Sequence, residues 1–372
     1  FFFSQGLAHQ RALVFLAPGI LILACGKLGA AWRNLRAAFG AAMTGPLTYL
    51  YLPLRAWQGA KWTFGQPGTW TGFWRMIADT KSSRIVGFDP EQPPGDHTAY
   101  FNRARNVIPC LNRDVVDLGH APTQWQRDRF PASFHDSMYV CHDGIRTDKL
   151  GPNPAAEIPL GRLAEPLRHG DEVVTYIARN MERARGFHMM MRALPEIQAA
   201  RPNARVLMIG GNESSYGAES KHPGGLRGEM EEELGDRVDW SRVHFVGRVP
   251  YAQLCQIIQL SRCHIYLTMP FVLSWSLLES MAMEATIVAA DVAPVREAIS
   301  HGETGLLVDF FDPKALAAQV SEVLARPADF AHLGRAARAH VVEHYDFLSR
   351  CLLQQLGRIN ALAQTPDKIA IG

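Results

Sequence analysis

The sequence predicts an α/β protein whose second half forms a doubly wound parallel sheet. From residue 171 onward, short apolar segments alternate with segments of helical periodicity, as in repeated βα units. Turn and helix signals fall at matching places: Gly210 and Gly211 close one strand, and Pro313 opens one helix. With 372 residues and a hydrophobic content of 47%, the chain is long enough for two domains with apolar cores.

The expected elements of this half follow one another in a regular order. Strands are predicted at 172–178, 204–209, 243–246, 263–267, 286–290 and 305–308. Helices are predicted at 187–200, 226–234, 251–260, 275–284, 294–300 and 313–325, and a polar, glycine-rich loop at 212–225. This succession places helices on both faces of the sheet.

The first half of the chain is less regular. The predicted elements are a helix at 99–111, short strands at 115–122 and 138–141, a helix capped by Thr123, and a linker at 151–170. The apolar segment 13–25 is too short to span a bilayer, so a buried strand and helix is favoured and a signal peptide is the alternative. Residues 32–80 show no clean period, which leaves a membrane-facing surface and a degraded segment both open.

The composition argues against several classes of function. Lys and Arg number 38 against 36 Asp and Glu, a net charge of +2, so no basic surface for nucleic acid is indicated. The six cysteines form no CxxC pair, which argues against a disulfide framework or a zinc site and favours a reducing compartment. There is also no HExxH motif, phosphate-binding GxxxxGK[ST] loop or Asp-x-Asp pair, so no metal is expected.

The candidate binding residues follow the predicted strands. The carboxyl ends of parallel strands share one edge of the sheet, where ligands of doubly wound proteins bind. Arg179 and Arg185 flank the loop after the first strand, and two guanidinium groups suit a diphosphate, although two solvated arginines are the alternative. Ser274 and Ser276 lie where a helix begins, and free N–H groups at such a place hold phosphate. Glu279, one turn further, lies among core residues and needs either a sugar diol or an internal salt bridge.

Several of these segments resemble a known family. The segments SLLESMA (276–282), TIVAADVAPVREAISHGETGLLVDFFDPKALA (286–317) and TYIARNMERARGFHMMMRALPEI (175–197) resemble the donor half of GT-B glycosyltransferases of family 4, which are retaining enzymes. With PTQWQRDRFP, HDG and PFVLSWSLLE, the sequence is similar to a bacterial subgroup associated with surface-polysaccharide synthesis. The resemblance covers about 84–345.

The resemblance implies two Rossmann-like domains and a donor site. The implied regions are an acceptor-side domain at 1–165, a nucleotide-sugar donor domain at 166–345, and a C-terminal helix at 346–372 that packs back on the first domain. Residues 1–80 are atypical for that first domain, which is therefore incomplete, truncated or divergent. The implied donor-binding residues are Arg179 and Arg185 for the diphosphate, Ser274, Trp275 and Ser276 for the phosphates, Glu279 for the ribose, Gly211 where the backbone approaches the ligand, and Arg248 and Val249 by the base.

Two positions depart from the family pattern. The first Glu of the family's Glu-x7-Glu pair falls on Phe271, which cannot accept a hydrogen bond from the donor sugar. The Gly that usually follows the helix falls on Glu284, whose Cβ disfavours a left-handed cap. No residue is assigned a catalytic role.

The function implied by the resemblance is transfer of a sugar from a nucleotide-diphosphate sugar to a glycan or lipid-linked acceptor, without a metal. We expect a cytoplasmic protein at the inner face of the membrane, with peripheral contact through its N-terminal half. One alternative is a scaffold that binds nucleotide sugars without turnover, which Phe271 supports. A nucleotide-sugar epimerase is the weaker alternative.

Overall fold

The computed structural model describes residues 117–161, 165–213, 215 and 220–364. These residues all lie within one compact unit, Asp89–Gly372. The helix expected at 99–111 and the interpretations of 1–80 fall outside the described residues, and the domain boundaries at 165 and 345 stay predictions.

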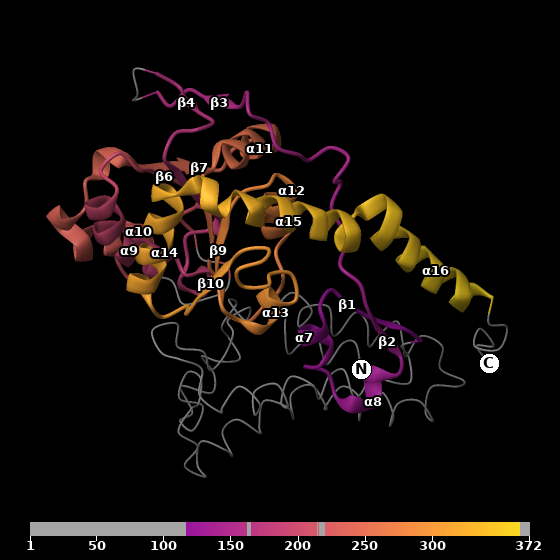
Figure 1. The fold of residues 1–372 in the computed structure, drawn as a ribbon. Helices are drawn as coiled ribbons and strands as arrows, with labels where there is room; N and C mark the ends of the chain where they lie inside the picture. The colour runs from indigo at the N-terminus through magenta and orange to yellow at the C-terminus, as the bar shows by residue number, and fades with distance from the viewer. Residues whose placement is uncertain (1–116, 162–164, 214, 216–219, 365–372) are drawn as a thin grey trace, which may run out of the picture. The chain divides into compact units, whose positions relative to one another are not determined.

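A six-stranded parallel sheet forms the centre of the described structure (Figure 1). Its strands, in spatial order, are β10 (Leu306–Val308), β9 (Ile287–Ala290), β8 (Cys263–Tyr266), β5 (Val173–Asn180), β6 (Arg205–Gly211) and β7 (Val243–Gly247). All six predicted strands are confirmed. The chain runs outward from β5 through β6 to β7 and then returns to β8, so the winding direction reverses between β5 and β8. A crevice opens beyond the carboxyl ends of the strands at such a reversal.

Helices cover both faces of the sheet (Figure 1). One face packs on α9 (Phe187–Ala200), α10 (Gly225–Leu234) and α14 (Pro313–Ala325), and the other on α11 (Tyr251–Leu260), α12 (Trp275–Ala282) and α15 (Pro327–Tyr345). Successive side chains of β5 point to opposite faces of the sheet. Val174 packs with α9, α10 and α14, and Val173 packs with α11. Burial on both faces accounts for the continuously apolar strands.

Two predicted helix starts are confirmed by their capping contacts. The Asp312 carboxylate accepts the N–H groups of Lys314 and Ala315, and Pro313 occupies the first turn of α14. Thr123 accepts the N–H of Gln126 at the start of α7 (Gln124–Arg127).

Two predictions about local structure are wrong in part. The helix expected at 294–300 is only α13 (Ala293–Arg296), because the chain then enters a turn that Gly302 closes with a φ of 78°. The expected linker at 151–170 contains an antiparallel pair, β3 (Glu157–Ile158) and β4 (Leu167–Arg168). Ile158 and Leu167 are buried against α11, so these apolar side chains fix a segment whose Pro and Gly content suggested a linker.

The described part of the first half is a small layer. β1 (Gly119–Ala121) pairs in parallel with β2 (Met138–Val140), and α7 and α8 (Ala132–His135) lie between them in the sequence. After α15, a π-helical turn (Phe347–Cys351) leads into α16 (Leu352–Ala363). Gln355 of α16 donates to the carbonyl of His142 over 3.3 Å, which joins the end of the described chain to the segment after β2.

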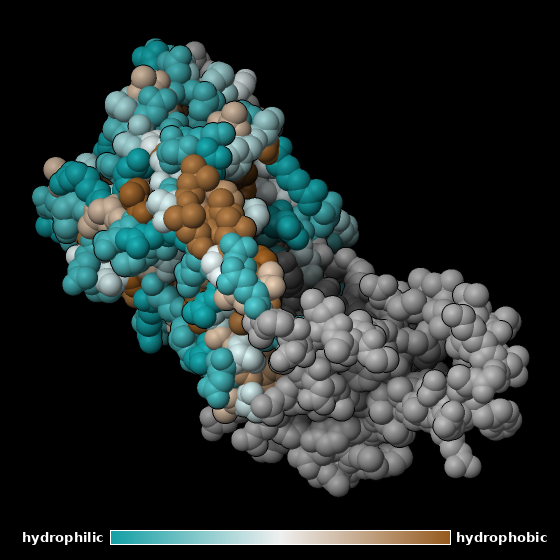
Figure 2. Space-filling model, turned by 90° about the vertical axis from the view of Figure 1, so that its right-hand side faces the viewer, coloured by the Kyte–Doolittle hydropathy of each residue, from teal (hydrophilic) through white to brown (hydrophobic). Residues whose placement is uncertain are grey.

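The surface is largely hydrophilic on the side shown in Figure 2, with one apolar patch among the coloured residues. Exposed large apolar side chains on α16 are Leu353, Leu356, Ile359 and Leu362. Across the described ranges, no helix combines the length and the apolar character needed to cross a membrane.

Candidate functional site

A cavity of about 720 Å³ lies at the carboxyl ends of the strands, where the winding direction reverses. Of the residues proposed from the sequence, it is lined by Arg179, Arg185, Arg248, Val249, Ser274, Trp275 and Ser276. The carboxyl ends of β5 and β6 and the segments after β5, β7 and β8 therefore meet in one place, as the strand pattern predicted. Gly211 and Glu279 do not line this cavity.

Arg185 is held at the reversal point by contacts with the end of β8. Its Nη1 donates to Oγ1 of Thr268 over 3.1 Å, and the side chain also hydrogen bonds with Tyr266. The next residue, Gly186, has a φ of 69°, and a Cβ there would lie 2.4 Å from Cβ of Leu267. Only glycine allows this close approach, so Gly186 sets the distance between the Arg185 loop and β8.

Arg179 reaches the cavity from an irregular end of β5. The pairing of β5 with β6 shifts register between Ile177 and Asn180, as in a β-bulge, which re-aims side chains at a strand end. Gly210 faces this bulge with a φ of 147°, and a Cβ there would lie 2.1 Å from the carbonyl oxygen of Ala178. Gly210 rather than Gly211 thus makes the close backbone approach inside the cavity.

Gly211 instead leaves room for the side chain of Arg248. A Cβ at Gly211 would lie 2.8 Å from Nη2 of Arg248. That guanidinium spans the end of the sheet, donating to Oδ1 of Asn180 over 3.0 Å and to Glu213 over 2.7 Å. Both Arg248 and Glu213 are exposed, so this ion pair contributes little stability.

The start of α12 lies at the cavity. Ser274 precedes the helix with extended backbone, its N–H donates to the hydroxyl of Tyr266 over 3.1 Å, and its Oγ lies 3.0 Å from Oγ of Ser276. The first turn of an α-helix carries N–H groups without intrahelical acceptors and a partial positive charge. Together with Arg179 and Arg185, this helix end makes the region favourable for an anion.

Glu279 is buried and has a partner that sequence reasoning missed. Its Oε1 accepts a hydrogen bond of 2.7 Å from the hydroxyl of Tyr251, at the start of α11. Burial raises the pKa of Glu279 above its ordinary value, and the Tyr251 hydrogen bond opposes that shift. The partner is therefore a phenol rather than the salt bridge considered from the sequence. No sequence signal marked Tyr251, since it lies 28 residues from Glu279 on another helix.

Phe271 lies where the resemblance expects a carboxylate. The guanidinium of Arg185 lies 5.5 Å from the centre of the Phe271 ring, within the range of a cation–π contact. An uncharged ring at this place cannot form an ion pair with Arg185 as a carboxylate would.

The segments after β1 and β2 supply cavity residues that had not been assigned. Pro122, His142 and Asp143 line it. Nδ1 of His142 accepts the N–H of Gly144 over 3.1 Å, and burial lowers the pKa of His142, which favours the neutral ring. The indole Nε1 of Trp275 donates to Oδ2 of Asp143 over 3.1 Å. The HDG motif at 142–144 was the sequence signal that could have pointed to His142 and Asp143.

The end of α12 contradicts the expectation for Glu284. A Cβ disfavours left-handed backbone, yet Glu284 has a φ of 62°. Arg338 of α15 donates to the carbonyls of Ala282 and Leu150, and its Nε lies 3.9 Å from the Glu284 carboxylate. Contacts to a neighbouring helix thus hold the cap that glycine would otherwise favour.

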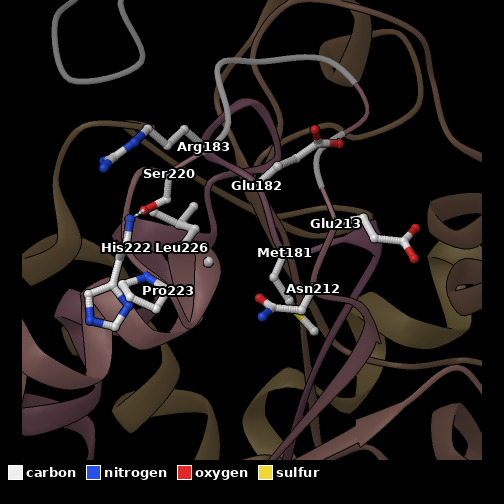
Figure 3. A pocket seen from close by; sticks show the side chains of 10 residues that line it. Met181, Glu182, Arg183, Asn212, Glu213, Ser220, His222, Pro223 and Leu226 are labelled. Carbon is white, nitrogen blue, oxygen red and sulfur yellow. Dashed lines mark hydrogen bonds between the residues drawn. The ribbon is translucent and has the colours of Figure 1, made fainter.

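A second cavity, of about 330 Å³, lies beside the loop that follows β6 (Figure 3). His222 and Pro223 lie on one side of it, and Met181 and Asn212 on the other. His222 accepts the N–H of Gly224 over 3.0 Å and lies 3.2 Å from Glu232, and Asn212 donates to the carbonyl of Gly224. These polar groups are engaged in holding the loop. In the described part of the chain, no group of three or more His, Cys, Asp or Glu side chains is arranged to hold a metal ion.

Comparison with known proteins assigns the family. Residues 171–326 match the sequence model described as glycosyl transferases group 1, and residues 80–150 match that of the glycosyl transferase family 4 group. The chain belongs to the group 1, family 4 glycosyltransferases. The two matches cover the six-stranded sheet and the segment that carries His142 and Asp143.

Individual family 4 relatives are distant in sequence. The chain is 26% identical over 258 residues to a GDP-mannose-dependent α-(1-6)-phosphatidylinositol monomannoside mannosyltransferase of Mycolicibacterium smegmatis, covering 66% of this chain and 63% of that one. It is 28% identical over 271 residues to a D-inositol 3-phosphate glycosyltransferase of Streptomyces scabiei, covering 71% and 56%. The chain thus spans less than two thirds of the length of these relatives.

Solved structures identify the fold of this glycosyltransferase as GT-B. Anabaena HepE, solved in complex with UDP-glucose, superposes with a TM-score of 0.59 at 18% identity, covering 74% of this chain and 70% of HepE. Sucrose-phosphate synthase of Thermosynechococcus elongatus gives 0.56 at 21% identity, covering 73% and 65%. At these identities the likeness establishes the fold alone.

Proposed function

We propose that this family 4 chain is a retaining, metal-independent glycosyltransferase. It would move a sugar from a nucleotide-diphosphate sugar to a glycan or lipid-linked acceptor in cell-surface polysaccharide synthesis. The observation that carries the proposal is the meeting of Arg179, Arg185 and the start of α12 in one cavity at the switch point of the sheet. Two guanidinium groups and a helix amino terminus form a site for a diphosphate.

The same groups suit the chemistry of glycosyl transfer. As the bond between C1 of the sugar and the diphosphate oxygen breaks, negative charge grows on the leaving nucleoside diphosphate. In this proposal Arg179, Arg185 and the N–H groups of α12, which line one cavity, stabilise that charge. The acceptor oxygen bonds to C1 from the same face, and its proton passes to a diphosphate oxygen, so the anomeric configuration is retained. This route needs no side chain as a general base.

The relatives support the substrate classes. The M. smegmatis relative is named for GDP-mannose and a phosphatidylinositol mannoside, the S. scabiei relative for inositol phosphate, and HepE was solved with UDP-glucose. We therefore propose a UDP- or GDP-linked hexose as donor. A lipid-linked acceptor would be reached at the cytoplasmic face of the membrane, through the N-terminal half.

A binding protein without turnover is the second candidate. Phe271 supports it, because the ring beside Arg185 cannot accept a hydrogen bond from a donor sugar. Such a protein would keep the diphosphate site and lack transfer.

A donor panel separates these possibilities. The full chain is incubated with UDP-glucose, UDP-galactose, UDP-N-acetylglucosamine or GDP-mannose, with and without phosphatidylinositol, inositol phosphate or glycan acceptors. Released nucleoside diphosphate and glycosylated product are measured by mass spectrometry in the presence of EDTA. The proposal expects an α-linked product from an α-linked donor. Binding without release supports the scaffold, a β-linked product contradicts retention, and a donor epimerised at C2 supports an epimerase.

A further inference from the structure

Trp275 lines the cavity and keeps a large exposed surface. Trp275 is 58% exposed although it lines the same hollow as Arg179 and Arg185. An exposed indole in a concave site offers a large apolar face to a ligand. None of the phosphate contacts proposed above uses this side chain, because those contacts come from the backbone at the start of α12.

A hydrogen bond also orients the indole. Its Nε1 donates to Oδ2 of Asp143 over 3.1 Å, and Asp143 itself lines the cavity and is exposed. A carboxylate has two oxygens and several acceptor sites, so this bond leaves acceptor capacity on Asp143 for a ligand hydroxyl group. Trp275 and Asp143 therefore present an aromatic face and an acceptor side by side.

The order of the strands places this pair at one end of the cavity. Arg248 and Val249 follow β7, Arg179 lies at the carboxyl end of β5, and Trp275 lies in the segment after β8. β8 and β7 are three strand spacings apart, or about 14 Å at roughly 4.8 Å per spacing. A nucleotide sugar laid along this edge with its base near β7 and its diphosphate near Arg179 extends its sugar towards Trp275.

We propose that Trp275 and Asp143 form the subsite for the hexose ring of the donor. The face of a pyranose that carries C–H bonds stacks on the electron-rich face of the indole, and a ring hydroxyl donates to Asp143. This inference rests on the proposed function, since it places the sugar of the same nucleotide sugar. The anionic diphosphate gains nothing from the indole face, whose quadrupole repels negative charge.

The test compares nucleotides with and without the sugar. Dissociation constants for UDP, UDP-glucose, GDP and GDP-mannose are measured by calorimetry on the full chain and on Trp275→Ala, with Asp143→Asn as the second variant. The Asn amide oxygen can still accept the indole N–H, so this change removes the charge and keeps the ring in place. Trp240→Ala is the control, because Trp240 precedes β7 and does not line the cavity at the carboxyl ends of the strands.

The inference expects a selective loss of sugar binding. Trp275→Ala should weaken binding of the nucleotide sugar used by wild type about tenfold, and Asp143→Asn about threefold, with the matching nucleoside diphosphate changed less than about twofold. An equal loss of affinity for the nucleotide with and without its sugar would assign Trp275 to the base or phosphates and overturn the inference. Unchanged affinity for both ligands would also overturn it. A wild-type chain that binds none of the four nucleotides contradicts the proposed function itself.

Discussion

The hydroxyl group of Tyr251 donates a hydrogen bond of 2.7 Å to Oε1 of Glu279. The bond joins the start of α11 to α12, so it couples the loop after β7 to the loop after β8. Glu279 is only 9% exposed, and this hydroxyl is the partner that its buried carboxylate requires. If Glu279 holds the ribose, Tyr251 fixes the carboxylate that does so.

The stability of the fold should depend on the ionisation of Glu279. Burial raises the pKa of this carboxyl above 4.5, so its stabilising contribution is complete below that pH and is lost as the pH rises through the raised value. Glu279→Gln cannot ionise and still accepts from Tyr251. The free energy of unfolding of Glu279→Gln, measured in urea, should increase relative to that of wild type as the pH rises from about 4 to 7. A difference that stays constant over that range contradicts the shifted pKa.

Removing only the phenol hydroxyl should destabilise the chain in a pH-dependent way. Tyr251→Phe keeps the ring and leaves the buried carboxylate without this donor, at a cost of about 1.5–3 kcal/mol near neutral pH. The cost should shrink when Glu279 is protonated. In the Glu279→Gln background, the loss of stability caused by Tyr251→Phe should depend little on pH. If the loss has the same pH profile in both backgrounds, the effect comes from packing rather than from the hydrogen bond.

The left-handed residue after α12 offers a stabilising substitution. Glu284 has a φ of 62°, which costs a residue with a Cβ about 1 kcal/mol or more relative to glycine. Glu284→Gly should therefore raise the free energy of unfolding by about 1 kcal/mol. The matched change Glu343→Gly, at an exposed position of α15, should lower it by about 0.5–1 kcal/mol. Destabilisation by Glu284→Gly would mean that the carboxylate contact with Arg338 outweighs the backbone strain.

Glu297, directly after α13, connects the unit of the six-stranded sheet to α7. Its carboxylate oxygens accept the N–H groups of Gln124 and Trp125, each over 2.7 Å, at the start of that helix. Glu297→Ala should cost about 1–2 kcal/mol in chemical unfolding, because it removes the acceptor of two first-turn N–H groups. Glu303→Ala, at an exposed turn nearby, should change stability by less than about 0.5 kcal/mol. Equal effects of the two changes would show that the contact contributes nothing.

The sequence predicts the sheet better than it predicts the contacts of the site. The six strands are recognisable because each is apolar and is separated from the next by a helical segment. Arg179 and Arg185 could be proposed because they follow a strand end. Tyr251 and Asp143 could not, since their partners lie 28 and 132 residues away in the chain and are brought together only by packing. The left-handed backbone of Glu284 was missed for the same reason, since the supporting Arg338 belongs to α15.

Calorimetric titration of nucleotides into site variants tests the central claim, that the cavity at the switch point binds a nucleotide diphosphate. The titrated ligands are UDP, GDP and their hexose conjugates, and the proteins are wild type, Arg179→Ala, Glu279→Ala and the control Arg168→Ala on β4. Losing a charge-assisted contact costs about 1.5–3 kcal/mol, so Arg179→Ala and Glu279→Ala should each raise Kd roughly ten- to hundredfold while Arg168→Ala leaves it unchanged. Unchanged binding in both site variants would contradict the assignment of this site.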